Sequence, residues 1–423
     1  MLLRSRIVLP VTAPPIEDGA VLVSGERIRR IGRWRDLRES GESPGEVADL
    51  GDSILMPGLV NAHCHLDYTH FAGHLAPPRR FTEWVQGVLG LKAGWSFSEY
   101  AGSWLAGAGE LLRSGCTSVM DFEAVPELLP EVWEGTPLRV QSAMEITGVR
   151  SGRSAESIVE EVIGCFERLQ PLPRGKSLAL APHAPYSTRP ELLRWSALAA
   201  RERGLGIACH VAESTEEFEM FTGATGPMFQ WLKAQRDMSD CGKGTPVAHV
   251  ARLGLLGPRT ILVHANHLDE DDVELIARSG SGVAHCPRSH DYFGHPPFPY
   301  RRLVDAGVRV ALGTDSLLSV RKAGAGTPRL SLFDEMRAFR RANPDVPAEE
   351  VLRMVADIGA GLTGWGGELG ELRAGCFADF VSLPYCGDAS GAVTAVVNHT
   401  GDVAGVMIGG RWEVTPPGAR EPA

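Results

Sequence analysis

The stretch MPGLVNAHCH, residues 56–65, includes most of the first of several short apolar runs in this chain that end in polar residues. The run Val60–Leu66 includes two histidines, His63 and His65, separated by a single residue. If the run is a strand, residues i and i+2 project to the same side, so both imidazoles point at one place. Two converging imidazoles suit a metal ion. An isolated H-x-H pair is often accidental, so its meaning depends on the rest of the chain.

Seven further apolar runs follow, and helical patterning separates them, as in Glu191–Arg203 and Glu270–Ser279. Eight β-α alternations over roughly 310 residues predict an α/β fold with a closed (β/α)₈ TIM barrel rather than an open sheet. The count carries this prediction, because no residue pattern reports closure itself. The eight runs lie near Val60–Leu66, Thr117–Phe122, Leu138–Ile146, Ser177–His183, Gly206–Val211, Thr260–His264, Gly282–Cys286 and Val308–Asp315.

The two ends of the chain differ from the middle. Residues 1–57 and 372–423 read as short strands separated by turn-forming residues, without the periodicity of a long helix. We expect them to pair into one small composite β-sandwich domain, with residues 58–371 forming the barrel. The predicted strands are Ala20–Ser24, Arg27–Ile31, Ser53–Met56, Phe380–Leu383, Val393–Val397 and Val406–Ile408.

Composition narrows the class of protein. The chain has 423 residues, is 43% hydrophobic and carries a formal net charge of −10. This acidic balance argues against general binding to nucleic acid or membranes. We find no signal peptide and no run near the ~20 apolar residues that a membrane helix needs. The eight cysteines include no C-x-x-C pair, which predicts free thiols in a reducing cytoplasm.

Ligand-type side chains recur at the ends of the predicted strands. His183 ends the fourth run, His210 the fifth, with Glu213 three residues on, His264 the sixth and Asp315 the eighth. The carboxyl ends of barrel strands form the active-site face, so these residues should converge there with the H-x-H pair. Taken singly, each is more often a core or turn residue, but the joint pattern is rarely accidental. H-E-x-x-H and P-C-x-x-C are missing, which argues against zincin proteases and small zinc base deaminases.

With these motifs the chain resembles the amidohydrolase superfamily, in its branch of cytosine, guanine, S-adenosylhomocysteine and chlorotriazine deaminases and hydrolases. The resemblance covers nearly the whole length. It rests on residues 56–65, the pair His210-Val-Ala-Glu213, the segment Val263–Leu268, the segment Leu312–Asp315, and Gly409–Trp412 near the end of the chain.

The resemblance implies a metal-dependent hydrolase with one divalent ion, zinc or iron(II), which activates a water. The fourth run ends Ala181–Pro182–His183, without the lysine of two-metal members, so a single ion is expected. Glu213 matches the family's proton-shuttling glutamate, and His264 the histidine that contacts the water. Asp315 would also help to orient that water. The implied metal ligands are His63, His65, His210 and Asp315.

The resemblance also suggests substrate contacts. Glu83, in Phe81-Thr-Glu-Trp84, matches a glutamate that binds ribose hydroxyls, although an exposed helix position explains it equally well. His183 matches a histidine that contacts the base or the ribose. Arg150 and Arg153 follow the third run, where related enzymes place carboxylate-binding arginines. Solvated surface charge is the competing interpretation of both arginines.

The segment His285-Cys-Pro-Arg-Ser-His290, followed by Phe-Gly-His295, resembles the aminodeoxyfutalosine deaminases of menaquinone biosynthesis. Their substrate is an adenine nucleoside that carries a benzoate, so Arg288 becomes a third candidate for a carboxylate. The leading hypothesis is deamination of 6-amino-6-deoxyfutalosine to futalosine and ammonia.

Alternatives stay open. They are an adenosine, methylthioadenosine, S-adenosylhomocysteine or guanine deaminase, and a hydrolase of a cyclic amide or chlorotriazine. A scaffold without activity is the third, but the intact ligand set argues against it.

Family members are often dimers or larger, which leaves a homodimer open. The segment Phe221–Ala248 is expected to form a helical excursion over the pocket.

Overall fold

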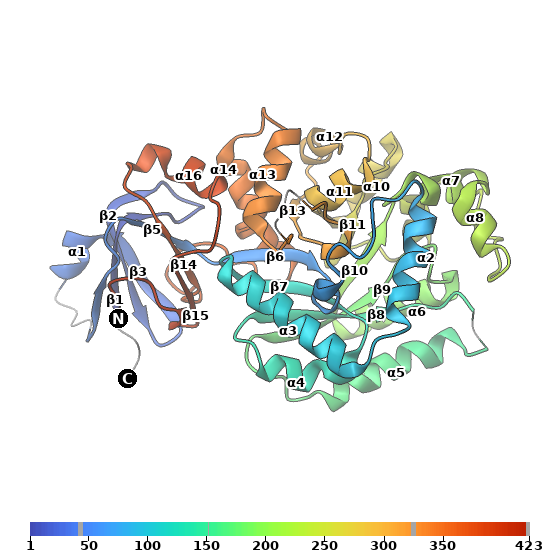
Figure 1. Cartoon of the computed structure of the whole chain (residues 1–423), viewed down its shortest axis with the longest axis horizontal. Coiled ribbons are helices and arrows are strands. Elements are labelled where there is room, and N and C mark those ends of the chain that lie inside the picture. Colours follow the sequence, from blue (N-terminus) through green and yellow to red (C-terminus); the bar gives the residue numbers. More distant parts are fainter. Residues whose placement is uncertain (41–44, 151, 323–326, 420–423) are drawn as a thin grey trace.

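The computed structural model describes residues 1–40, 45–150, 152–322 and 327–419. Figure 1 shows a β-sheet built from both ends of the chain, beside a larger body of alternating strands and helices. Strand β6 (Leu59–Cys64) runs from that terminal sheet through the larger body toward helix α2 (Phe81–Lys92). The carboxyl ends of the strands parallel to β6 therefore open on the side away from the terminal sheet.

The larger body is the predicted (β/α)₈ barrel. Its strands are β6, β7 (Cys116–Glu123), β8 (Arg139–Ile146), β9 (Lys176–Pro182), β10 (Gly206–Val211), β11 (Thr260–His264), β12 (Gly282–His285) and β13 (Val310–Leu312). They are parallel and neighbour one another in chain order. A bridge between Cys64 and Asp315 brings the last strand to the first, and the backbone N–H of Thr314 donates to the carbonyl of His63 at 3.0 Å.

Helices surround the strands, as the pattern of alternation predicts. The long ones are α2, α3 (Phe97–Arg113), α5 (Ala155–Arg168), α6 (Pro190–Arg203), α10 (Glu270–Ser279) and α13 (Leu332–Ala342). The shorter ones are α4 (Leu129–Glu134), α7 (Thr215–Gly223), α8 (Gly226–Leu232), α9 (Pro246–Arg252), α11 (Pro287–Phe293), α12 (Tyr300–Asp305), α14 (Ala348–Met354) and α15 (Asp357–Leu362). Short 3₁₀ turns are η1 (Leu66–Phe71), η2 (Pro126–Leu128), η3 (Leu317–Ser319) and η4 (Ala389–Gly391).

Local sequence explains where these helices begin and end. Helices α3 and α10 both start with a capping box, formed by Ser96 with Glu99 and by Asp269 with Asp272, which satisfies free backbone N–H groups at the helix start. Helix α10 ends at Gly280, whose φ of 75° is left-handed and favours glycine. The predicted helix Glu270–Ser279 therefore has the bounds that its terminal residues dictate.

The terminal sheet joins both ends of the chain. Its strands are β1 (Leu2–Val8), β2 (Ile16–Ser24), β3 (Arg27–Arg33), β4 (Val47–Asp49), β5 (Ser53–Pro57), β14 (Phe380–Pro384), β15 (Gly405–Ile408) and β16 (Arg411–Val414). The order is β16-β15-β14-β5-β1-β2-β3, with β4 beside β1 and the short helix α1 (Trp34–Arg38) after β3. The antiparallel pair β5–β14 links the two ends, with Leu55 opposite Ser382. The sheet has a hydrophobic core of its own that includes Leu3, Val21, Leu55 and Phe380.

One predicted strand of this region is wrong. Residues Val393–Val397 belong to helix α16 (Ala392–Val397). The buried residues Ala392, Val393, Val396 and Val397 are spaced i, i+1, i+4 and i+5, which is one face of a helix rather than the alternation of a strand. The β-branched valines suggested a strand, but burial of this face decides the conformation.

A buried ion pair connects the barrel to the terminal sheet. Arg139, the first residue of β8, donates from Nε and Nη2 to the two carboxylate oxygens of Asp379, at 2.8 and 3.0 Å. Asp379 also accepts the backbone N–H of Gly409 at 2.8 Å, and the Arg139 guanidinium lies 3.9 Å from the ring centre of Phe377. This bidentate geometry fixes the position of the barrel relative to the sheet.

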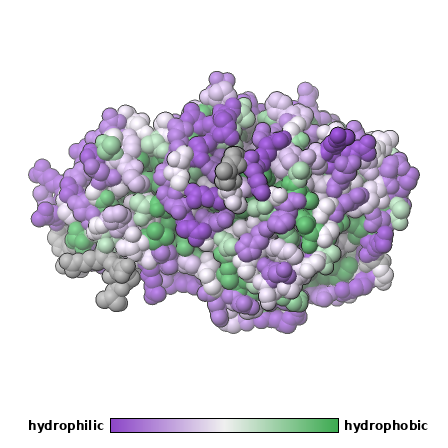
Figure 2. All heavy atoms as spheres, viewed as in Figure 1, coloured by the Kyte–Doolittle hydropathy of each residue, from purple (hydrophilic) through white to green (hydrophobic). Residues whose placement is uncertain are grey.

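On the face shown in Figure 2, hydrophilic side chains dominate and hydrophobic ones form small patches among them. Among the described helices, none combines the length and the apolar character that crossing a membrane requires.

Candidate active site

Four potential metal ligands converge at the carboxyl end of the barrel. His63 and His65 come from β6, His210 from β10, and Asp315 from the turn after β13. The Nε2 atom of His210 lies 3.3 Å from Nε2 of His63 and 3.4 Å from Nε2 of His65. The Oδ1 atom of Asp315 lies 3.6 Å from Nε2 of His63 and 3.8 Å from Nε2 of His65.

These separations fit a single metal ion. Ligand atoms at the zinc–nitrogen distance of about 2.1 Å in a tetrahedral arrangement are separated by about 3.4 Å. Within the described residues, two groups of three ligand-type side chains have their ligand atoms within 4.8 Å of one another. One group is His63, His210 and His264, and the other is His63, His65 and Asp315. Imidazole and carboxylate ligands suit zinc and iron(II).

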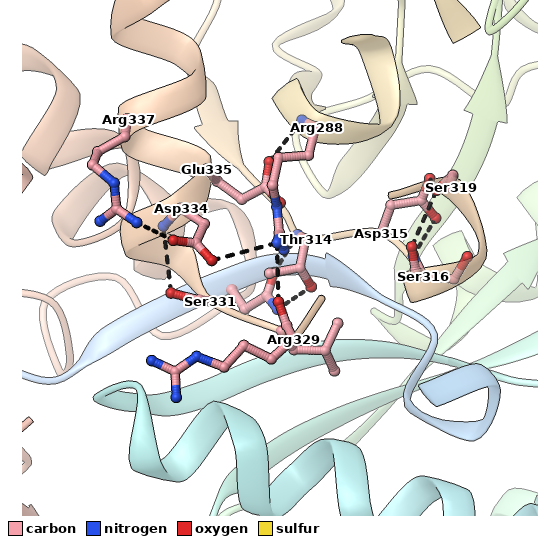
Figure 3. Close-up of polar contacts among 12 residues, drawn as sticks. Arg288, Thr314, Asp315, Ser316, Ser319, Arg329, Ser331, Asp334, Glu335 and Arg337 are labelled. Atoms are coloured by element: carbon pink, nitrogen blue, oxygen red, sulfur yellow. Dashed lines mark hydrogen bonds and ion pairs between the residues drawn. The ribbon is translucent and has the colours of Figure 1, made fainter. Parts of the chain in front are cut away.

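Neighbouring groups orient these side chains. The Nδ1–H of His210 donates to the carbonyl oxygen of His183 at 2.9 Å, so its Nε2 keeps a free lone pair. Asp315 accepts the backbone N–H of Ser316 on Oδ1, at 2.7 Å, and the hydroxyl of Ser319 on Oδ2, at 2.9 Å (Figure 3). Burial lowers the pKa of His65 and of His210 well below the usual range, which keeps both rings neutral, as a metal ligand must be.

The backbone turns sharply at three of the strand ends. Ala212, His264 and Asp315 have φ values of 54°, 73° and 53°, in the left-handed region that residues other than glycine rarely adopt. The turn at Ala212 separates His210 from Glu213, and both side chains line the same cavity. Such strain persists only where the surrounding structure imposes it, and it concentrates at functional sites.

Glu213 and His264 form a second pair beside the ligand cluster. The Nε2 atom of His264 lies 3.5 Å from Oε1 of Glu213. Asn266 donates to the backbone carbonyl of Glu213 at 3.0 Å, which fixes the turn that carries the carboxyl group. Burial, and then the charge of Asp315, raise the pKa of Glu213 well above its usual range. Burial lowers the pKa of His264 to about 3. These opposite shifts favour the protonated form of the Glu213 carboxyl and the neutral form of the His264 ring.

A cavity of about 540 Å³ opens above this cluster, a size typical of small-molecule sites. One wall is a face of α2, from which Trp84, Val85, Val88, Leu89 and Lys92 line the cavity at helical spacing. Helix α8 and the residues after it supply Trp231, Leu232 and Gln235, so the expected excursion Phe221–Ala248 does reach the cavity. His183, Tyr186 and Arg150 also line the cavity.

The structure separates the predicted substrate contacts into two groups. His183 and Arg150 line the cavity. The Nδ1 atom of His183 lies 2.8 Å from the hydroxyl of Ser187, and its ring centre lies 4.7 Å from that of His210. Glu83 and Arg153 are exposed and do not line it. Glu83 comes directly before Trp84, the first residue of α2 that lines the cavity. Arg153 donates from Nη2 to Glu161 at 2.6 Å.

Arg288 has a different partner from the one expected. Its Nε donates to the buried carboxylate of Glu335 on α13, and its backbone N–H donates to the same carboxylate at 2.9 Å (Figure 3). Its Nη1 donates to the carbonyl of Arg329 at 3.0 Å and lies 3.5 Å from Asp334. Arg288 does not line the cavity. Sequence reasoning could not detect this pairing, because the acidic partner lies 47 residues away on another helix.

Sequence reasoning also missed two charged residues in the cavity wall, Lys92 and Glu145. Glu145 is the penultimate residue of β8. The reasoning about strand ends that selected the histidines applies equally to this position. Lys92 lies eight residues after Trp84 on the same helix, so the helical period connects them once Trp84 is known to face the cavity.

Proteins of known activity are similar to this chain over most of its length. A 5-methylthioadenosine/S-adenosylhomocysteine deaminase of Nitratidesulfovibrio vulgaris (strain DSM 19637 / Miyazaki F) is 30% identical over 402 residues, covering 91% of this chain and 85% of that protein. Among solved structures, an adenosine deaminase from Xanthomonas campestris with bound zinc has a TM-score of 0.82 at 24% identity, covering 100% of this chain and 94% of that one. Helicobacter pylori aminofutalosine deaminase in complex with methylthio-coformycin has a TM-score of 0.83 at 21% identity, covering 97% and 99%. At these identities, the two structural likenesses establish the fold.

The class of protein is thus a barrel hydrolase with a cluster of ligand-type side chains at the carboxyl ends of its strands. The model of the amidohydrolase family matches residues 54–412, which include the whole barrel. The chain belongs to the amidohydrolase family, and it is a hydrolase that acts on carbon–nitrogen bonds.

Proposed function

We propose that this protein removes the amino group of an adenine-type nucleoside by hydrolysis, with His63, His65, His210 and Asp315 holding one divalent ion, zinc or iron(II). The observation that carries the proposal is the buried Glu213 carboxyl beside His264, facing the same cavity as the ligand cluster. Replacing an amino group by oxygen requires a proton donor for the ring nitrogen and for the leaving ammonia. A carboxyl group with a raised pKa can protonate the ring nitrogen.

The residues act on the proton and on the position of the water. An ion held by these four residues would lower the pKa of a water molecule bound to it to about 7. Asp315 and His264 orient the water and accept its proton, while Ser316 and Ser319 hold the Asp315 carboxylate in place. The water oxygen forms a bond to the ring carbon that bears the amino group. Glu213 gives its proton to the adjacent ring nitrogen, and the proton taken from water passes to the amino group. The carbon–nitrogen bond then breaks, ammonia leaves, and the proton that remains on the new hydroxyl returns to the Glu213 carboxylate as the ring carbonyl forms.

Both the lining of the cavity and the names of the related proteins support an adenine-type nucleoside as the substrate. Trp84, Tyr186 and Trp231 supply aromatic surface, which suits a planar heterocycle. The curated relative described above deaminates methylthioadenosine and S-adenosylhomocysteine by its name, and the two structural neighbours are adenosine and aminofutalosine deaminases. These names support adenine nucleosides as the substrate class.

Within that class, the proposed substrate is 6-amino-6-deoxyfutalosine, which is converted to futalosine in menaquinone biosynthesis. Its benzoate has an aromatic ring and one carboxylate. The cavity wall offers apolar surface from Val85, Leu89 and Trp231, together with the guanidinium of Arg150. The resemblance of residues 285–295 to aminodeoxyfutalosine deaminases supports the same choice.

An assay of ammonia release tests this proposal on 6-amino-6-deoxyfutalosine, methylthioadenosine, S-adenosylhomocysteine and adenosine. The benzoate-bearing nucleoside should have the highest kcat/KM. Replacement Arg150→Met should raise its KM by about tenfold or more, the effect of losing a charge-assisted hydrogen bond, with little change for methylthioadenosine. Arg153→Met is the comparison, because Arg153 lies outside the cavity and its loss should leave KM unchanged. Equal kcat/KM with and without the benzoate would contradict the choice of substrate.

A further inference from the structure

A buried arginine connects two parts of the cavity wall that lie far apart in the sequence. Only 2% of the Arg236 side chain is exposed. The backbone N–H of Arg236 donates at 3.0 Å to the carbonyl of Leu232, the last residue of α8. Its Nη1 donates at 3.1 Å to the carbonyl oxygens of Pro185 and of Tyr186, in the loop after β9. The side chain therefore joins the segment after α8 to the loop that carries Tyr186.

The other N–H groups of the guanidinium bind acceptors within the segment after α8. The Nε atom donates to the carbonyl of Asp237 at 3.1 Å, and Nη2 forms an ion pair with Asp240. The Oδ2 atom of Asp240 lies in turn 3.6 Å from Nε2 of His249 on α9. The planar fork of an arginine can reach the two loop carbonyls and the carboxylate at once, which the single ammonium of a lysine cannot do.

The tip of the loop after β9 relies on Arg236 for its backbone hydrogen bonds. The barrel holds the start of this loop, because the backbone N–H of His183 donates to the carbonyl of Ile146 at 3.0 Å. Within the described residues, the hydrogen bonds recorded for the carbonyls of Pro185 and Tyr186 all come from Arg236. A buried carbonyl without a donor is costly, so loss of this side chain would release the tip while the start stays attached.

Both segments that Arg236 joins contribute to the cavity. Tyr186 lines it from the loop, and Trp231 and Leu232 line it from the end of α8. Tyr186 and Leu232 also belong to one buried hydrophobic cluster, together with Phe81 at the start of α2. Apolar packing is not directional, whereas hydrogen bonds prefer a narrow range of angles. The guanidinium therefore fixes how these two parts of the wall are placed.

We infer that Arg236 is a positioning residue for substrate binding, which keeps Tyr186 and Trp231 in place on the cavity wall. The inference rests on the proposed function, because a planar base is what these aromatic rings would contact. The proposed metal ligands and Glu213 lie at the ends of other strands or just after them. Loss of Arg236 should therefore weaken binding and leave the chemical step in place.

Steady-state kinetics of zinc-loaded protein test this inference, using the nucleoside that the unaltered protein deaminates best. In Arg236→Met, KM should rise by about tenfold or more, because apparent affinity falls with the fraction of molecules that keep the wall in place, whereas kcat should stay within about twofold. Arg236→Lys keeps a positive charge beside Asp240 and should raise KM by less. Asp379→Asn is the control, because it breaks a buried ion pair at the opposite ends of the strands and should leave KM unchanged.

Limited proteolysis gives a readout that does not depend on activity. Lys233 and Lys243 are exposed and lie on either side of Arg236 in the sequence. Trypsin cleaves backbone that opens locally, so it should cut at these two lysines about tenfold faster in Arg236→Met than in the unaltered protein. Mass spectrometry of the fragments identifies the sites. Asp379→Asn should not accelerate cleavage there.

Three results would overturn the role of Arg236. They are an unchanged KM in Arg236→Met or Arg236→Lys, a fall in kcat as large as the rise in KM, and cleavage at Lys233 and Lys243 no faster than in Asp379→Asn. If Arg236→Met does not fold, Arg236→Lys decides by the same two readouts. An unaltered protein that releases no ammonia from any nucleoside contradicts the proposed function instead, and cleavage then decides whether Arg236 holds the segment.

Discussion

At the scale of single residues, the chemistry depends on which side chains carry a proton. Burial, and then the charge of Asp315, raise the pKa of Glu213, so its carboxyl keeps a proton to higher pH than an exposed glutamate does. His264 is neutral for the same reason of burial. Glu213 can therefore donate a proton and His264 can accept one. Oε1 of Glu213 lies 3.5 Å from Nε2 of His264.

Replacement Glu213→Gln keeps the size and hydrogen-bonding capacity of the side chain but removes the transferable proton. We expect kcat to fall by about 10²- to 10⁴-fold, the usual contribution of general acid–base catalysis, with zinc content unchanged. Steady-state kinetics and metal analysis of the same sample check this. A variant that retains full kcat would show that another group supplies the proton.

Glu217 gives a prediction about stability and pH. Its Oε2 accepts the backbone N–H of Glu213 at 2.8 Å, and burial raises its pKa to about 8, compared with about 4.3 for an unperturbed glutamate. Between these two pH values the folded protein keeps a proton that the unfolded chain has lost. The free energy of unfolding should therefore fall as pH rises through this window, by up to about 1.4 kcal/mol per pH unit from this residue alone.

Glu217→Gln removes that dependence, because the amide does not ionise. Relative to the unaltered protein, the variant should become progressively more stable from pH 5 to pH 8 in urea unfolding experiments (roughly the window in which the proton difference acts). Glu219→Gln, exposed on the same helix, provides the control. A stability difference that is constant across the window would mean that Glu217 is ionised throughout.

At the scale of elements, the strand ends position the site, and the pairing of α11 with α13 supports them. Arg288 of α11 and Glu335 of α13 form a buried ion pair next to the turn that carries Asp315 (Figure 3). Breaking such a pair by removing one partner leaves an uncompensated buried charge. This ion pair connects the segment 285–290 to α13.

Replacement Arg288→Met should lower the free energy of unfolding by about 3–5 kcal/mol. The double replacement Arg288→Met with Glu335→Leu should recover much of that loss, because neither charge then remains buried. Denaturant unfolding measures both. A single variant of normal stability, with a KM raised only for carboxylate-bearing nucleosides, would instead restore Arg288 as a substrate contact.

The helices and strands differ in how well the sequence predicts them. The eight barrel strands were predictable because each is an apolar run bounded by turn residues, and the converging histidines because strand ends share one face. The surroundings of Glu83 and Arg288 could not be predicted in this way. Those of Glu83 depend on how α2 is rotated about its axis, and those of Arg288 depend on a partner residue from α13. The Val393–Val397 run shows the same limit, because burial of its face against the rest of the molecule made it helical.

At the scale of the whole molecule, the terminal sheet and the barrel are held together by Arg139 and Asp379, both buried. The pair lies at the start of β8, whereas the cavity lies at the opposite ends of the strands. Its contribution should therefore appear in stability rather than in catalysis.

Asp379→Asn should lower the free energy of unfolding by about 3–5 kcal/mol, because the Arg139 charge stays buried without its partner. At temperatures where the variant is folded, kcat and KM should be unchanged. Arg278→Met, which breaks the exposed pair of Arg278 with Glu274, is the control and should cost at most about 1 kcal/mol. Equal effects of the two replacements would mean that the buried pair does not fix the sheet to the barrel.

The most direct test of the proposed function is ammonia release from adenine nucleosides by protein with a known metal content. The account predicts about one zinc or iron(II) per chain, release of one ammonia per nucleoside consumed, loss of activity on chelation and recovery when the metal is restored. Protein that holds one metal ion per chain and releases no ammonia from any of these nucleosides would contradict it.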